Sequence, residues 1–218
     1  RNTPKYNFLF QIAKVIFRHN LVMRDMHATY VDPYSKENVL VMVLGIHGQE
    51  GQAAWDAADL TDFLRELVRV KFFAKEDLID KELVNAKVVS GNFGNLIRVF
   101  VPLVHQFLLH LDPNFYTPEL IEEAYCTQPE LVQKICQLFE AKFHPEKRSQ
   151  ERYEEVKKSL IHEIGKLDTG HEAYDALKKN VLFQTVRFIQ FILKTNFYRR
   201  NLTALSFRID PRFMEELP

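Results

Sequence analysis

The feature that most constrains this chain is a long run of helical patterning that begins after Lys75. Apolar side chains recur there at three- and four-residue spacing, and no convincing strand interrupts them before about residue 201. Ser90 to Gly94 should break or kink the run, and Pro102 should kink or restart a helix. We expect helices over residues 76–89, 96–111, 117–125, 128–143, 150–167 and 172–194.

The first part of the chain has a different pattern. Residues 6–19 and 53–73 have helical spacing, whereas residues 21–31 and 39–46 read as strands joined by a turn at Asp32-Pro33. The order helix, strand, strand, helix is most of a small ACT or ferredoxin-like sandwich that lacks its leading strand. The predicted fold class is therefore α+β, predominantly α.

A last strand is expected near the end of the chain. Residues 202–209 alternate in the manner of a strand, which Asp210-Pro211 should end. The expected organisation is an ACT-like portion over residues 1–74, a helical domain over 75–200 and a truncated further domain over 201–218. Because the chain starts at Arg1 and stops after Leu217-Pro218, we expect it to be a piece of something longer.

Composition excludes several classes of function. Lysine plus arginine and aspartate plus glutamate each number 29, and this neutrality argues against nucleic-acid binding. No apolar run approaches the length of a membrane helix. Cys126 and Cys136 do not have a zinc spacing and are expected to be buried thiols in a reducing compartment. The eight histidines are scattered, and no metal site is predicted.

The glycine-rich turn after the second strand is the one candidate ligand site. Gly45, Gly48 and Gly51 follow a strand and precede a helix, but their spacing is wrong for a dinucleotide fingerprint. One interpretation is a flexible strand-to-helix turn. The other is a regulatory amino-acid loop, in which His47 and Glu50 would supply the polar contacts.

Two C-terminal motifs carry a resemblance to a known family. Lys194-Thr-Asn-Phe-Tyr198 followed by Ala204-Leu-Ser-Phe-Arg-Ile-Asp-Pro211 resembles the large-type NAD-dependent glutamate dehydrogenases, where a long helix leads into the first strand of the catalytic region. Residues 129–145 resemble the preceding helical part of that family. The Tyr30-Val-Asp-Pro-Tyr-Ser35 hairpin looks like its ACT-like portion.

This resemblance implies oxidation of L-glutamate to 2-oxoglutarate and ammonia by a parent enzyme that uses NAD. The family's catalytic and NAD-binding motifs match no residue here, so the segment should be catalytically silent and bind no cofactor. Lys194, Asn196 and Arg208 would form a structural junction with the catalytic region. The resemblance further implies contacts with the rest of the parent chain, a homo-oligomer, and a cytoplasmic or mitochondrial-matrix location.

Two other functions compete with this interpretation. The chain could be a free-standing helical interaction module that carries an ACT-like amino-acid sensor. It could also be an enzyme in its own right, although no catalytic constellation is recognisable in the sequence.

Overall fold

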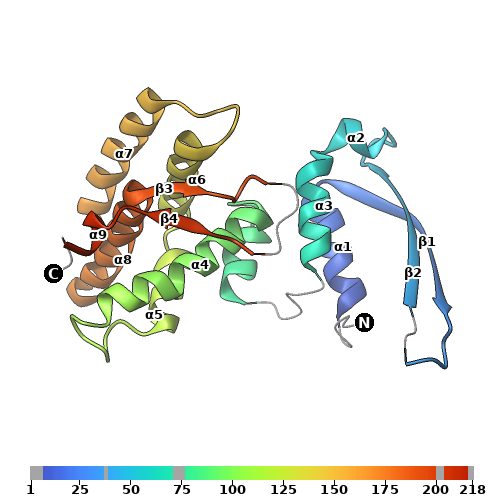
Figure 1. The fold of residues 1–218 in the computed structure, drawn as a ribbon, viewed down its shortest axis with the longest axis horizontal. Helices are drawn as coiled ribbons and strands as arrows, with labels where there is room; N and C mark the ends of the chain where they lie inside the picture. Colours follow the sequence, from blue (N-terminus) through green and yellow to red (C-terminus); the bar gives the residue numbers. More distant parts are fainter. Residues whose placement is uncertain (1–6, 37–38, 71–76, 200–203, 216–218) are drawn as a thin grey trace. The chain divides into compact units, whose positions relative to one another are not determined.

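The structure, a computed structural model, describes residues 7–36, 39–70, 77–199 and 204–215 (Figure 1). The backbone divides into two compact units, residues 1–76 and residues 77–218. The architecture is α+β and predominantly helical, as predicted, with two small antiparallel sheets.

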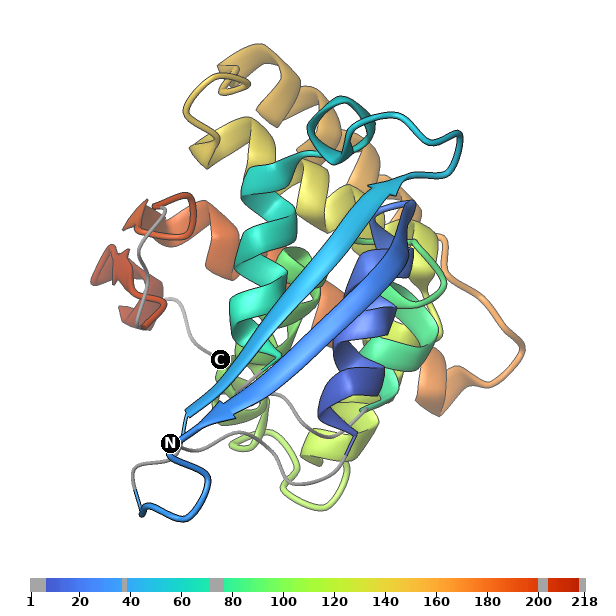
Figure 2. The ribbon, with the colours of Figure 1, turned by 90° about the vertical axis from the view of Figure 1, so that its right-hand side faces the viewer.

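In the first unit, the helices α1 and α3 pack on one face of a β-hairpin (Figure 2). The predicted order of helix, strand, strand and helix is confirmed. The bounds are α1 Phe8–Arg18, β1 Leu21–Val31, β2 Val39–Gly48, α2 Ala54–Ala57 and α3 Leu60–Arg69. Its buried core is small: Ile12, Val15, Ile16, Leu21, Ala54, Phe63 and Val70. The ACT-like assignment stays a prediction, since the described sheet of this unit has only these two strands.

The helix expected over residues 53–73 is in fact two helices. The chain is extended at Ala58 and Asp59, between α2 and α3. The Asp59 carboxylate accepts the backbone N–H groups of Thr61 and Asp62 at 2.8 and 3.2 Å, so it caps a new helix start. The predicted residues 71–73 lie outside the described part of the chain.

The second unit is a helical domain around one large apolar core. The N-cap residues of four of its helices are Ser90, Thr117, Gln128 and Ser149, and all but Gln128 cap the helix with a side-chain oxygen. The bounds are η1 Asp80–Val84 (a π-helix), α4 Gly91–Leu108, α5 Pro118–Cys126, α6 Pro129–Phe143, α7 Gln150–Gly165, α8 Glu172–Phe191, β3 Ile192–Thr195, β4 Phe207–Ile209 and α9 Arg212–Glu215.

The predicted break occurs a few residues earlier than expected. Residues 85–89 separate η1 from α4, and Ser90 is extended and caps α4, whereas residues 91–94 form the first turn of that helix, which continues through Pro102. A Cβ atom on Gly94 would lie 2.5 Å from Val84 Cγ2, so this glycine allows the preceding turn to pack against the helix. Before α4, the chain forms the short π-helix η1 instead of the α-helix expected over residues 76–89.

The last predicted helix and strand also have different bounds. α8 ends at Phe191 rather than Lys194, and the next residues form β3, which pairs with β4 in antiparallel fashion. Within the described residues, the strand expected over 202–209 is limited to Phe207–Ile209, and residues 202–203 lie outside them. α8 can end there because the Asp210 backbone N–H donates to the Phe191 carbonyl at 2.9 Å, and so brings β4 to the helix end.

Candidate functional site

The Asn196 side chain joins the two strands of the β3–β4 hairpin. Its Nδ2 donates to the Ala204 carbonyl at 3.0 Å, and its Oδ1 accepts the Ser206 backbone N–H at 2.8 Å. The Asn196 backbone N–H donates to the Ser206 carbonyl at 3.4 Å. Asn196, which follows β3, therefore binds the residues just before β4 with its side chain and its backbone.

Lys194 and Arg208, the other two residues of the predicted junction, are directly opposite each other in the β3–β4 register. Residues opposite one another in an antiparallel pair project from the same face, and both side chains are exposed. No acidic side chain among the described residues forms an ion pair with either of them. Two like charges in this position repel each other, so this face favours an anionic neighbour.

The glycine-rich turn satisfies most of its own polar groups. The His47 ring Nδ1 lies 2.6 Å from the Gly48 carbonyl, and the Glu50 backbone N–H donates to Gln52 Oε1 at 2.9 Å. Gly48 has no room for a side chain, since a Cβ atom there would lie 2.4 Å from Gln52 Cδ. Gly51 has a φ of 83°, and open space surrounds it. Substituting Gly48 would therefore disturb the turn itself, whether or not a ligand binds there.

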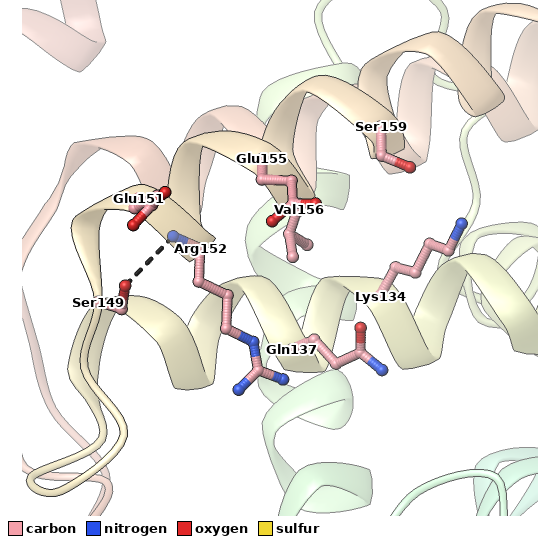
Figure 3. A pocket seen from close by; sticks show the side chains of 8 residues that line it. All are labelled: Lys134, Gln137, Ser149, Glu151, Arg152, Glu155, Val156 and Ser159. Carbon is pink, nitrogen blue, oxygen red and sulfur yellow. Dashed lines mark hydrogen bonds between the residues drawn. The ribbon is translucent and has the colours of Figure 1, made fainter.

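A groove of about 470 Å³ runs between α6 and α7 (Figure 3). Arg152 extends from α7 toward Gln137 of α6, and Lys134 lies at the other end of the groove. Lys134 forms an ion pair with Glu163, whose carboxylate also accepts a hydrogen bond from Ser159 at 2.8 Å. The groove thus has side chains of both charges on an open surface.

A second hollow of about 580 Å³ lies around the loop between α7 and α8. Its central carboxylate, Asp175, already accepts the Thr169 backbone N–H and hydroxyl at 2.8 and 2.6 Å. These bonds lower the pKa of Asp175. We assign this carboxylate to capping of the loop rather than to ligand binding.

The buried side chains that could act as nucleophiles are held in their neutral forms. Burial raises the pKa of the Cys126 thiol to about 12 and also raises that of Cys136. Burial raises the pKa of the Tyr125 hydroxyl, which contacts the Thr185 hydroxyl at 2.5 Å. No cluster of metal-binding side chains occurs in the described ranges. None of their helices is both long enough and apolar enough to cross a membrane.

Sequence reasoning missed two interactions that fix the second unit. Lys142 Nζ donates to the carbonyls of Ile189 and Gln190 at 2.8 and 2.7 Å, and so caps the end of α8. Arg98 donates to both carboxylate oxygens of Asp77, at 2.5 and 2.7 Å. Sequence spacing could not indicate either interaction, because the partners lie 21 residues apart for Arg98 and Asp77 and 47 or 48 residues apart for Lys142 and the end of α8.

By its fold, the chain is a predominantly helical α+β protein. Its sequence is 30% identical over 115 residues to "Glutamate dehydrogenase 2" of Dictyostelium discoideum. That match includes 51% of this chain and 11% of the Dictyostelium protein, so the chain spans about a tenth of its relative. No family model and no solved structure matches the chain.

Proposed function

We propose that this chain is a non-catalytic segment of an NAD-dependent glutamate dehydrogenase. The observation that carries the proposal is the 30% identity over 115 residues to a protein of that name. In such an enzyme, L-glutamate, NAD and water would give 2-oxoglutarate, ammonia and NADH. The buried, neutral thiols and the lack of a metal-binding cluster among described residues are compatible with a scaffolding role.

The scaffolding role would centre on the β3–β4 hairpin. The Asn196 bonds fix the chain that leaves α8, and Lys142 caps the same helix end. The exposed cations Lys194 and Arg208 would then face acidic groups in the remainder of the enzyme. The segment would in this way set the direction in which the chain enters the catalytic region.

The first test is an activity measurement on the complete open reading frame that encodes these residues. We expect glutamate-dependent reduction of NAD by the complete protein and none by residues 1–218 alone. Absence of glutamate-dependent NADH formation by a folded, complete protein would contradict the proposal.

The second test separates the junction from general stability in the complete enzyme. N196A should lower kcat/KM, since it removes both side-chain bonds across the hairpin. The matched control is N180A, which removes a bond of 2.6 Å to the Tyr116 hydroxyl inside the helical unit. Equal effects of the two variants at temperatures where both remain folded would rule out a special role for the junction.

The sensor function is kept as a second proposal, supported by the position of the glycine-rich turn between β2 and α2. An amino-acid effector bound there should raise the melting temperature of the chain in a saturable way. H47A and E50A are better probes than a Gly48 substitution, because Gly48 is tightly packed. If none of the twenty amino acids shifts the melting temperature, the chain has no sensor site.

A further inference from the structure

Within the residues that the structure describes, strand β2 has an open edge. β1 pairs with one side of β2 along its whole length, and on the other side the described residues add one bridge, between His47 and Ala53. Figure 2 shows the hairpin in front of α1 and α3, which lie behind it and leave its other face uncovered within this unit. An open edge presents unpaired backbone N–H and C=O groups that can bind another strand. Two-stranded sheets are also marginally stable by themselves.

The two edges of the hairpin differ in their protection against pairing. On β1, the register shifts between Met23 and Asp25, and Arg24 is 80% exposed. A bulge and exposed charges are features that prevent edge-to-edge association. Strand β2 has no ionisable side chain and no proline from Val39 to Ile46, and its pairing with β1 is regular from Val39 to Gly45.

The open edge of β2 is also apolar on the uncovered face. Val39, Val41 and Val43 are 53%, 42% and 60% exposed, although valine favours a buried strand. The alternate residues Leu40, Met42, Leu44 and Ile46 are half-buried on the face toward the helices. A strand that pairs here must therefore be uncharged and apolar on both faces.

We propose that β2 pairs with β2 of a second copy of this chain, and that a four-stranded antiparallel sheet results. Strand β2 of a second copy is itself uncharged and apolar from Val39 to Ile46, which is what a strand that pairs at this edge needs. A twofold axis perpendicular to the sheet keeps the faces matched, so that residues of the uncovered face lie beside residues of the uncovered face and those toward the helices beside their equivalents. The corresponding pairing of β1 would bring the bulge and the charges of Arg24 and Asp25 into the interface.

The structure also indicates the register of this pairing. The free stretch of β2 lies between its first residue, Val39, and His47, which already bridges to Ala53. Its central residue is Val43, so the twofold axis would pass there. Val43 would then lie opposite Val43 of the second copy, and Val41 opposite Gly45. This inference rests on the first unit alone and does not depend on the proposed function.

Sedimentation velocity of residues 1–218 over a wide concentration range tests the pairing. We expect a reversible dimer for the wild-type chain. V43K and V43E should each weaken it at least about tenfold, because like charges would meet at the axis. An equimolar mixture of V43K and V43E should restore the dimer. The matched controls T29K and T29E place the same charges on β1, opposite Val41, and should leave association unchanged.

Disulfide trapping tests the register and does not require that a charged variant fold well. Residues directly opposite in antiparallel strands have Cα atoms about 4.5–5.5 Å apart, within the range of a disulfide. V43C should therefore form a dimer on oxidation, whereas V41C should not, as its two copies would be separated by about 13 Å along the strands. The native cysteines are buried and should not interfere. A wild-type chain that stays monomeric at about 100 μM, or equal trapping of V41C and V43C, would overturn the proposal.

Discussion

Lys142 connects the ends of two helices and is the residue whose ionisation should be visible in stability. Burial, with Lys157 and Arg148 nearby, lowers its pKa to about 8 from the ordinary value of 10.5. Its bonds to Ile189 and Gln190 need two N–H groups, and a neutral amine still has two. Deprotonation therefore leaves the cap of α8 in place.

The pH dependence follows from that shift. Between pH 8 and pH 10.5 the unfolded chain holds a proton that the folded chain has released, so the free energy of unfolding gains a contribution that rises with pH. We expect the difference in stability between the wild type and K142M to grow from pH 7 to pH 10 in urea denaturation. K157M removes a neighbouring positive charge and should flatten the rise. A difference that shrinks with pH would contradict this account of Lys142.

Substitution of Gly94 by alanine tests whether the close packing at this position stabilises the fold. A Cβ atom there would meet Val84 Cγ2 at 2.5 Å, so G94A should destabilise the chain by about 1–3 kcal/mol. Gly165, at the end of α7, has nothing within 4 Å of such a Cβ atom and provides the control. G165A should be neutral or stabilising by up to about 1 kcal/mol, because alanine loses less backbone entropy than glycine. Urea denaturation of both variants measures the contrast, and equal losses would be inconsistent with it.

The residues differ in how well the sequence predicts their roles. The sequence pattern places Asn196 at the end of a long helix, whereas in the structure it follows β3 and its partners lie 8 and 10 residues further along the chain, just before β4. The partners of Lys142 lie 47 and 48 residues away, and no local pattern indicates them. The need for glycine at position 94 depends on the π-helix before it, which sequence reasoning took for an α-helix.

At the scale of elements, η1 is held to α4 by a charged cluster. Arg98 of α4 binds Asp77 through two nitrogens and Asp80 Oδ1 at 2.8 Å. Burial opposes ionisation of Asp77, but the Arg98 guanidinium and the Asp80 backbone N–H outweigh it and lower the pKa of Asp77. The π-turn thus depends on a side chain from the next helix.

Acid should weaken this contact. Because the folded-state pKa of Asp77 lies below 3.8, its stabilising contribution is present above that pH and is lost as pH falls through the lower, folded-state value. D77N should cost about 1 kcal/mol at pH 7, a value reduced by partial exposure, and the deficit should disappear at strongly acidic pH. Thermal unfolding at several pH values measures it. D112N is a control, since Asp112 caps a turn through Asn114 and Phe115 without an arginine partner.

The helices that sequence reasoning placed best are those with a chemical start signal. Thr117 before Pro118 and the Gln128-Pro129-Glu130 sequence mark helix starts that the structure confirms. The errors occur where a distant contact decides the backbone. η1 forms against Arg98, and α8 gives way to β3 because β4 pairs with it.

At the scale of the whole molecule, the two units have very unequal cores. Among the described residues, 7 hydrophobic side chains are buried in the first unit and 34 in the second. Buried apolar area is the main favourable contribution to folding, so most of the stability should reside in residues 77–218. The open β2 edge belongs to the less stable unit, which would gain most from pairing with a second copy.

Residues 77–218 should therefore fold without the first unit. Expressed alone, they should unfold cooperatively within a few degrees of the main transition of the full chain, because their core is contained in one unit. Residues 1–76 alone should unfold at a much lower temperature and gain stability with concentration if β2 self-pairs. V43K should remove that concentration dependence and leave the main transition of the full chain unchanged. Calorimetry of the two fragments and the full chain distinguishes these outcomes. A fragment 77–218 that fails to unfold cooperatively would show that the second core is incomplete without the first unit.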